Sequence, residues 1–489
     1  MNKEFNLRLV LRVMGSLALV ESVVLLAMCL IPLIYGENDA YYFLISSGIS
    51  FTFALAALFF GRNSSTQIGK REGSVIVTFT WIVFSLFGLL PFWLSGSIPS
   101  FSNAFFETIS GFTTTGASIL NNIEELSHGM LFWRSMTHWI GGIGIIVISL
   151  AILPLFSTSG TQLFAAETTG PTKDKIHPKI SETSKRLFLI YVILTATETV
   201  LLYLGGMTFF DAVCQSFATI ATGGFSTKQA SIAYWDSPYI QYIIILFMIL
   251  SGINFSLYYF GFKNKFSKIW ENEELRYYLI LLFTFAIIIT FSLIDFSKIQ
   301  SFTTLEKAWR DAFFTVSSLM TTTGFCTADY MTWKPMTWFL LLIVMLTGAS
   351  AGSTSGGIKM IRIVISAKTC YYEFKRLIHP NAVIPVRYNG YLVREDILTR
   401  VLAFTLLYLL VAAFGIFVLA LSGMGFQESI GGMITCLGGV GPGLGLVGPS
   451  GNFANIPEFS KWFLSLMMLT GRLELFTVLL LFTPAFWKR

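Results

Sequence analysis

The chain has 489 residues, of which 54% are hydrophobic and only 12% are charged, and its mean hydropathy is +0.69. Because a soluble domain carries about a quarter charged residues, this composition argues against a water-soluble protein and indicates one solvated mainly by lipid. The net charge of +6 follows a topological pattern described below, so it does not call for a nucleic-acid partner. The five cysteines and four histidines are dispersed, without the spacing of a disulfide framework, a metal site or a hydrolytic centre.

Two helices are expected first, over residues 9–35 and 40–60, joined by the turn Gly36-Glu37-Asn38-Asp39. The first apolar run lacks a small-residue cleavage site followed by a polar mature domain, so we do not predict a cleaved signal peptide. No polar loop of the kind described next follows either helix. We therefore predict a separate N-terminal two-helix hairpin over residues 1–65.

Four units follow, each with two apolar runs that match the length of a bilayer-spanning helix. The runs lie near 74–95 and 131–155, 187–205 and 239–262, 275–294 and 335–365, and 397–421 and 459–486. Between the two runs of each unit lies a half-length segment, such as 103–112 or 311–320, that is too short to cross a bilayer. We expect these segments to enter the membrane and turn back, with their polar start as an N-terminal cap at the outer surface.

The half-length segments share one spacing, in which an acidic or amide residue stands thirteen positions before a glycine. The pairs are Asn103 and Gly116, Asp211 and Gly224, Asp311 and Gly324, and Glu428 and Gly441. Any one of these glycine-marked loops could be an ordinary turn, but four at one offset favour a shared purpose. The sequence thus predicts an all-α membrane protein with four parallel span–pore-helix–span repeats, at 66–160, 161–265, 266–385 and 386–489, around one pseudo-fourfold pore.

The basic residues indicate the orientation of the repeats. Of the 33 Lys and Arg residues, 25 fall in alternate connections, which by the positive-inside rule face the cytoplasm together with both termini. The glycine-marked loops then open outward. A re-entrant helix that starts outside points its carboxyl end, with about half a negative charge, at the membrane centre. Four such ends would favour a cation there and repel an anion.

A cation that leaves water must exchange its hydration shell for protein oxygens, and ion filters supply rings of backbone carbonyls. Aiming successive carbonyls at one axis takes unusual backbone angles, which glycine tolerates. The neighbouring threonines can add hydroxyl oxygens and hold the loop by local hydrogen bonds. We therefore predict that the chain conducts cations.

The loop sequences resemble a known family. Segments 107–118 (E-T-I-S-G-F-T-T-T-G-A-S), 221–227 (A-T-G-G-F-S-T), 320–327 (M-T-T-T-G-F-C-T) and 439–445 (G-V-G-P-G-L-G) are similar to the four filter segments of the TrkH/KtrB superfamily of potassium transporters. The resemblance spans essentially the whole chain, and the two extra N-terminal helices favour the TrkH type. It implies potassium as the transported ion, preferred over sodium, and a filter made of Thr114, Thr115, Gly116, Thr222, Gly223, Gly224, Thr322, Thr323, Gly324, Gly439, Val440 and Gly441. The fourth loop departs most from the family's pattern.

Residues 346–357 read L-T-G-A-S-A-G-S-T-S-G-G in the middle of an apolar run. Such a stretch is a poor helix interior, and irregular backbone is not tolerated against lipid, so it lines a wet cavity or is buried in protein. The alternative is a small-residue face for helix packing. The resemblance implies an intramembrane gating loop below the filter, made of Gly348, Ala349, Ser350, Ala351, Gly352, Ser353 and Thr354, with Arg472 as the remaining gate residue.

Arg472 lies within the last apolar run, where a charge costs from about 2.5 kcal/mol upward and must face the protein interior or a wet cavity. One interpretation is a structural ion pair with Glu198 or another buried acid. The other is a fixed positive charge in the permeation path below the filter. The resemblance favours the second, because the family has an arginine in its last span that forms a barrier to ions.

Residues 443–448 match G-x-G-x-x-G, but no strand of a βαβ unit precedes them. We therefore predict no nucleotide site and no cofactor in this chain. The resemblance implies a homodimer with one pore per subunit, and a separate cytosolic, nucleotide-binding ring protein of the TrkA type as regulator. The basic connection 359–400 offers that protein a docking surface, or it carries only positive-inside charge in contact with anionic lipid.

Two alternatives come from other functional classes. A secondary transporter, a symporter driven by sodium or protons, also uses broken helices around a midplane site. Here the four repeats run in the same sense with their loops on the outer side, which favours a channel-like pathway. A membrane-embedded enzyme lacks any cluster of nucleophile, base or metal ligands in the sequence. The predicted location is the bacterial cytoplasmic (inner) membrane.

Overall fold

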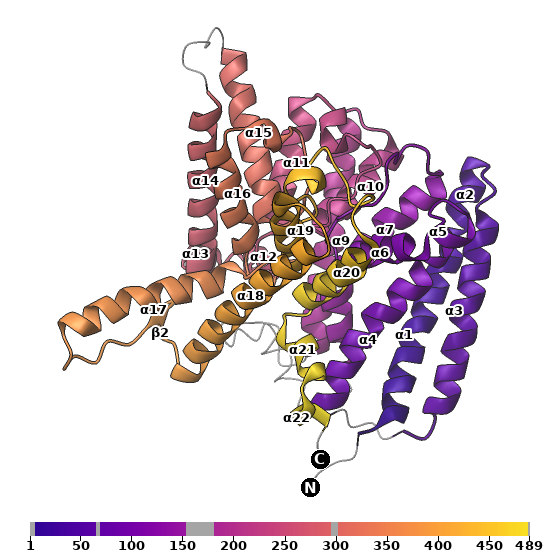
Figure 1. The fold of residues 1–489 in the computed structure, drawn as a ribbon, viewed down its shortest axis with the longest axis horizontal. Coiled ribbons are helices and arrows are strands. Elements are labelled where there is room, and N and C mark those ends of the chain that lie inside the picture. Colours follow the sequence, from indigo (N-terminus) through magenta and orange to yellow (C-terminus); the bar gives the residue numbers. More distant parts are fainter. Residues whose placement is uncertain (1–4, 65–68, 153–179, 295–301, 488–489) are drawn as a thin grey trace.

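A computed structural model describes residues 5–64, 69–152, 180–294 and 302–487. Within these residues the regular structure is helical (Figure 1), except for a hairpin in which β1 (Arg387–Tyr388) pairs antiparallel with β2 (Tyr391–Leu392). Six described helices are long and apolar enough to cross a membrane, and eight if each of two bent helix pairs counts as one span. The predicted all-α membrane fold is confirmed, with the short hairpin as an addition.

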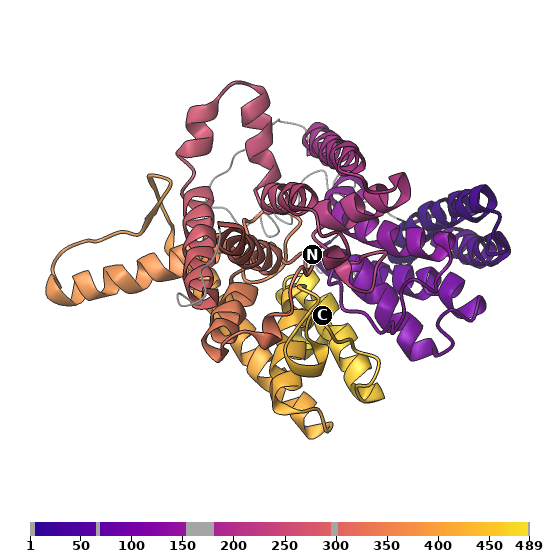
Figure 2. The same cartoon turned by 90° about the horizontal axis from the view of Figure 1, so that it is seen from above.

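The N-terminal hairpin consists of α1 (Leu7–Met28), continued by α2 (Leu30–Tyr35), and α3 (Ala40–Gly61). The two long helices approach closely because small residues face the partner helix. A Cβ atom on Gly61 would lie only 2.6 Å from the Arg12 nitrogen. The hydroxyl of Ser47 donates to the Ser22 carbonyl across the same contact, at 2.7 Å. This hairpin lies at the edge of the molecule, outside the repeats (Figure 2).

Each repeat has a first helix, a pore helix and a second helix. The first helices are α4 (Lys70–Gly88) with its extension α5 (Leu90–Leu94), α9 (Ile180–Leu204), α14 (Glu273–Leu293) and α18 (Glu395–Leu421). The pore helices are α6 (Phe101–Phe112), α10 (Phe209–Ile220), α15 (Phe302–Met320) and α19 (Phe426–Gly438). The second helices begin with α7 (His128–Ile152), α11 (Pro238–Ser251), α16 (Pro335–Thr347) and α20 (Glu458–Arg472). Seen from above, the repeats follow one another around a common centre (Figure 2).

The pore helices start earlier than their polar residues suggest. Ser100 and Thr208 cap α6 and α10 by accepting from the backbone N–H groups of Asn103 and Asp211. The two predicted caps are therefore the third residues of their helices, as in the first half of a capping box. The third segment, expected to begin near residue 311, is the second half of the 19-residue helix α15.

Three second helices are interrupted within the predicted apolar runs. The run at 239–262 bends by 96° between α11 and α12 (Phe255–Phe262), and the run at 459–486 bends by 114° after α20. The run at 335–365 stops at Gly348, whose φ is +66°, and helix resumes only at α17 (Met360–Ile378). The break after Gly348 agrees with the prediction that residues 346–357 are not a helix interior. The other two bends were not predicted, because an apolar run has the same hydropathy whether its helix is straight or broken.

The remaining elements are short. Helix α13 (Phe266–Trp270) links α12 to α14, and the last span ends with α21 (Phe476–Leu479), the 3₁₀ turn at Leu480–Phe482 and α22 (Pro484–Trp487). The rings of Phe5 and Trp487 lie 5.9 Å apart, so the two ends of the described chain meet. Helix α17 projects from the body in both views (Figures 1 and 2). The predicted domain boundaries at 65/66 and 160/161 fall outside the described residues, and the other two stay predictions.

Candidate ion pathway

The chain takes the same unusual shape after each pore helix. The first predicted filter position of each loop has a positive φ, at Thr114 (+55°), Thr222 (+55°), Thr322 (+58°) and Gly439 (+69°). The third position is also left-handed, at Gly116 (+80°), Gly224 (+79°), Gly324 (+84°) and Gly441 (+103°). Three threonines hold a conformation that side-chain-bearing residues rarely adopt. The recurrence of this strain shows that the surroundings of all four loops impose one backbone shape.

The four loops form a closed ring. A Cβ atom on Gly116 would lie 2.0 Å from the Gly223 carbonyl oxygen, one on Gly224 equally close to that of Thr323, and one on Gly324 equally close to that of Val440. The fourth loop returns to the first, because a Cβ on Gly441 would lie 2.9 Å from the Thr115 oxygen. All twelve predicted filter residues therefore come together, and the four third-position glycines border one hollow of about 90 Å³.

The four loops differ in their hydroxyl groups. The Thr113 and Thr115 hydroxyls lie 2.8 Å apart in the first loop, and those of Thr321 and Thr323 lie 2.7 Å apart in the third. The corresponding residues of the second and fourth loops are Ala221 with Gly223 and Gly438 with Val440. The backbone thus repeats four times, while the hydroxyl pairs alternate around the ring.

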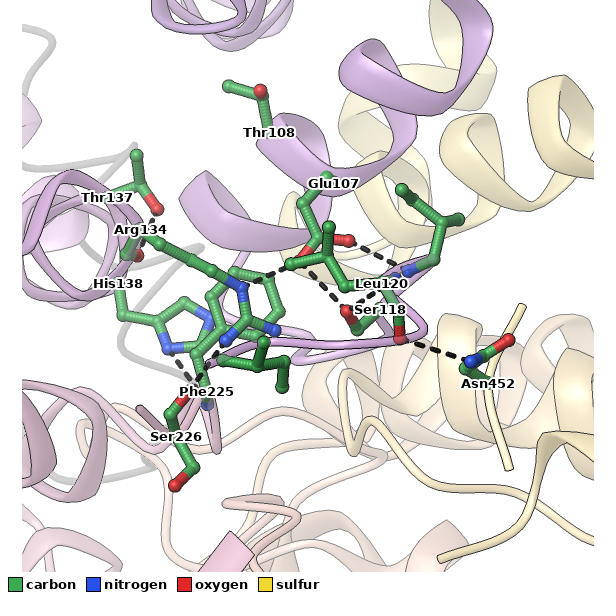
Figure 3. Close-up of polar contacts among 12 residues, drawn as sticks. Glu107, Thr108, Ser118, Leu120, Arg134, Thr137, His138, Phe225, Ser226 and Asn452 are labelled. Atoms are coloured by element: carbon green, nitrogen blue, oxygen red, sulfur yellow. Dashed lines mark hydrogen bonds and ion pairs between the residues drawn. The ribbon is translucent and has the colours of Figure 1, made fainter. Parts of the chain in front are cut away.

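A buried ion pair braces the first two loops on their outer side (Figure 3). Glu107 of α6 accepts from Arg134 Nε of α7 at 2.7 Å, and their side chains are only 1% and 3% exposed. The Glu107 carboxylate also accepts from the Ser118 hydroxyl and from the Ile119 N–H, at 3.0 and 2.8 Å. Because each partner has further hydrogen bonds, the pair meets the condition under which a buried ion pair is tolerated.

Arg134 connects this brace to the second loop. Its Nη1 donates to the Ser226 carbonyl at 2.9 Å, and its guanidinium lies 3.6 Å from the centre of the Phe225 ring. The imidazole of His138 stacks on that ring at 4.0 Å. Phe225 directly follows Gly224, so two side chains of the first repeat fix the exit of the second loop.

Three of the four residues that stand thirteen positions before the glycines form hydrogen bonds with chain outside their own pore helices. Asp211 accepts from the Thr227 hydroxyl at 2.6 Å, and Asn103 accepts from the Lys461 ammonium at 2.8 Å. Glu428 accepts from the Leu446 N–H at 3.2 Å. At three of the four positions the residue therefore ties its pore helix to the chain that leaves its loop or to a neighbouring repeat.

The predicted gate residues lie directly against the ends of the pore helices. Thr354 donates its hydroxyl proton to the carbonyl of Ile220, the last residue of α10, at 3.0 Å. Further along the same irregular stretch, the Gly357 N–H donates to the carbonyl of Gly438 at the end of α19, at 2.9 Å. The Gly356 N–H donates to the Thr322 hydroxyl of the third loop, at 2.7 Å. The stretch between α16 and α17 is thus packed beneath the ring of loops.

Arg472 is the last residue of α20, immediately before the 114° bend. Its Nη1 donates to the Thr354 carbonyl at 2.9 Å and its Nη2 to the Gly141 carbonyl of α7 at 2.8 Å. In the described part of the chain no ion pair joins it to Glu198 or to another carboxylate. Glu474 instead accepts from Arg362 Nη2 of α17, at 2.5 Å. Arg472 therefore connects the end of the gate stretch, at Thr354, to the second helix of the first repeat.

Sequence reasoning missed two ion pairs of this region, Glu107 with Arg134 and Arg362 with Glu474. A signal did exist, because charged residues in otherwise apolar helices must find partners. Their partners, however, lie 27 positions away for Glu107 and Arg134, and 112 positions away for Arg362 and Glu474. A single sequence does not reveal such pairings.

Comparisons with known proteins agree with this geometry. The family model described as "TrkH: Cation transport protein" matches residues 42–489. The chain belongs to the TrkH family. It is 39% identical to the Trk system potassium uptake protein TrkH of Escherichia coli K12, over 99% of this chain and all of that protein. It is 37% identical to the protein of the same name from Halomonas elongata, with the same coverage. The crystal structure of the potassium transporter TrkH from Vibrio parahaemolyticus matches with a TM-score of 0.88 at 34% identity, covering 98% of this chain and 99% of that one.

Proposed function

We propose that this chain takes up potassium ions across a bacterial cytoplasmic membrane through a channel-like pore. The observation that carries the proposal is the ring of four loops, each with left-handed backbone at its first and third positions. Relatives that match along their whole length are named potassium uptake proteins. A ring of backbone oxygens can replace the water shell of a cation, so we assign the twelve loop residues to a selectivity filter for potassium.

The gate is proposed to be the stretch at residues 348–354 together with Arg472. The proposal is supported by the hydrogen bonds that the stretch and its continuation form with Ile220 and Gly438, at the ends of two pore helices, and with Thr322 of the third loop. The carboxyl ends of the pore helices there carry partial negative charge that attracts a cation. The Arg472 guanidinium opposes it, because two like charges repel by several kcal/mol at contact distance and an effective dielectric of about 20.

Helix α17 supports the proposal of a homodimer. It projects from the body and exposes four apolar side chains along its second half, Tyr371, Phe374, Leu377 and Ile378. A second copy of this chain is the occupant that we propose for this face. Contact with a second copy would remove these side chains from water, which stabilises association.

The cytoplasmic face is proposed to bind a nucleotide-binding ring protein that regulates the gate. The basic connection 359–400 offers less charge than its sequence suggests. Lys359 and Arg362 are buried, and Lys368 forms an ion pair with Glu273. Four basic residues stay exposed for docking or for anionic lipid, namely Lys375, Arg387, Arg394 and Arg400.

Reversal potentials in proteoliposomes test the proposed function. With opposed potassium and sodium gradients at equal pH, the zero-current potential should follow the potassium gradient. If it moves when a pH gradient is imposed, the chain is instead a coupled symporter, and if it follows the sodium gradient, the pathway selects sodium and the potassium assignment is wrong. A folded protein that carries no current with either ion contradicts the filter assignment.

A further inference from the structure

Glu274 is a buried carboxylate, 3% exposed, in the first turn of α14. Its Oε1 atom accepts two backbone hydrogen bonds, from the Ala351 N–H at 2.7 Å and from the Ile361 N–H at 3.1 Å. Ala351 lies inside the proposed gate stretch, and Ile361 is the second residue of α17. One oxygen of one side chain therefore ties together the two sides of the break between α16 and α17.

Both of these N–H groups need an outside acceptor. Ile361 is in the first turn of its helix, where backbone N–H groups have no partner within the helix. Ala351 lies in irregular chain, where a buried N–H without an acceptor is costly. The carboxylate in turn would be costly to bury without donors. Each group thus stabilises the other, and the position of the gate stretch depends on a different helix from those that flank it.

The neighbouring contacts extend this connection toward the cytoplasmic surface. Glu273, the residue before Glu274, forms an ion pair with Lys368 of α17. The Glu273 N–H donates to Asn389 Oδ1, in the turn between β1 and β2, at 2.8 Å. The start of α14 therefore holds the gate stretch, the projecting helix and the small hairpin at one place. A movement of α17 relative to α14 would act on all three.

We propose that Glu274 is the positioning residue that holds the gate stretch in its occluding place. The inference rests on the proposed function of that stretch as a gate. The proposed role of Glu274 is separate from the filter. In the described chain Glu274 forms no hydrogen bond with any of the twelve filter residues. When both bonds to Oε1 break, the stretch loses its anchor on this side and the open state becomes more populated.

The test is potassium flux per folded protein in proteoliposomes without any cytosolic partner, measured for four variants. Glu274→Ala removes the acceptor, and we expect flux to rise about tenfold, because a hydrogen bond to a charged group shifts an equilibrium by about that factor. Glu274→Asp keeps the charge but is one methylene too short to reach both N–H groups, so flux should rise as well. Glu274→Gln keeps an oxygen at the same place and should stay near wild type. Glu271→Ala removes an exposed acid three residues before Glu274. It is the matched control and should not change flux.

The outcomes separate this inference from the proposed function. Deleting residues 348–354 should raise flux if the stretch is a gate at all. The deletion could raise flux while the folded Glu274→Ala and Glu274→Asp variants do not. Glu274 would then have no part in positioning the gate, and the inference would be overturned. If the deletion does not raise flux, the gate itself is wrong. The potassium-to-sodium permeability ratio should be unchanged in Glu274→Asp, and a fall in that ratio would show that the residue supports the filter instead.

Discussion

The proposed filter side of this molecule, formed by the four loops, repeats one structure, whereas the proposed gate side, formed by the four second helices, does not. On the filter side, four pore helices end in loops with the same pattern of left-handed backbone, and the loops touch in a closed ring. On the gate side, the four second helices differ from one another. α7 is one helix over residues 128–152, α11 and α20 are followed by bends of 96° and 114°, and α16 is separated from α17 by irregular chain.

The difference has a physical reason. An ion on the axis benefits from equivalent oxygens on all sides, so the backbone of the filter side is repeated. A gate needs one mobile segment with two positions, and one interrupted helix is enough to supply it. The gate stretch contacts the end of the second pore helix and its continuation contacts the end of the fourth, but both are supplied by the third repeat. In the proposed function, symmetry therefore belongs to ion binding, and asymmetry belongs to gating.

The largest predicted effect concerns the brace between Glu107 and Arg134 of the first repeat. Glu107→Ala leaves Arg134 as a buried unpaired charge, so we expect the free energy of unfolding to fall by about 3–5 kcal/mol. Gln215 stands nine residues before Gly224, as Glu107 does before Gly116, and its neutral amide donates to the Ser226 hydroxyl at 2.8 Å. Gln215→Ala should cost only about 1 kcal/mol. Thermal unfolding in detergent compares the two, and equal losses would show that the charged brace is no stronger than the neutral one.

A second pair of variants asks whether the ring depends on the close approach of its loops. Gly324→Ala places a Cβ within 2.0 Å of the Val440 oxygen, whereas a Cβ on Gly439 meets nothing within 4 Å. Both variants carry the left-handed backbone cost of about 1–2 kcal/mol, so only the clash distinguishes them. We expect Gly324→Ala to lower the potassium-to-sodium permeability ratio about tenfold, and Gly439→Ala to lower it much less. Similar potassium-to-sodium permeability ratios in both folded variants would show that selectivity does not depend on the close approach of the loops.

A third prediction concerns the charge on the gate side. Arg472→Ala removes both the positive charge and the bonds to the Thr354 and Gly141 carbonyls. Potassium flux per folded protein should rise about tenfold, since removal of several kcal/mol of repulsion exceeds the 1.4 kcal/mol that a tenfold change requires. Arg472→Lys keeps the charge and should change flux much less. An alanine variant that is no faster than wild type would assign Arg472 to structure alone.

The smallest predicted effect tests the alternation within the ring. Thr113→Ala gives the first loop the residue that the second loop has at Ala221, and it removes the hydroxyl that pairs with Thr115. Because one neutral hydrogen bond contributes about 1 kcal/mol, stability should fall by that amount while the permeability ratio stays near wild type. A large drop in the ratio would mean that the hydroxyl pairs, and not the backbone alone, determine selectivity.

The sequence predicted the filter side better than the gate side, for a physical reason. Gly116, Gly224, Gly324 and Gly441 each have a positive φ, which is a local backbone requirement that glycine meets and that leaves a fixed spacing in the sequence. The bends after Ser251 and Arg472 instead depend on contacts with other repeats. Asn254 caps α12 by accepting from the Ser256 N–H, whereas Leu475, before α21, has a left-handed backbone (φ +33°) that its residue type does not indicate. Glu274 could not be assigned at all, because its two partners lie 77 and 87 positions away.

The division between the two sides is tested most directly by one reversal potential, measured on the folded protein that lacks residues 348–354. Potassium and sodium gradients are opposed across the proteoliposome membrane at equal pH. The account predicts a larger current than in wild type and the same reversal potential, because the filter loops keep their contacts with one another. A reversal potential that moves toward zero as the current grows would contradict it, because the gate stretch would then be part of the selectivity filter.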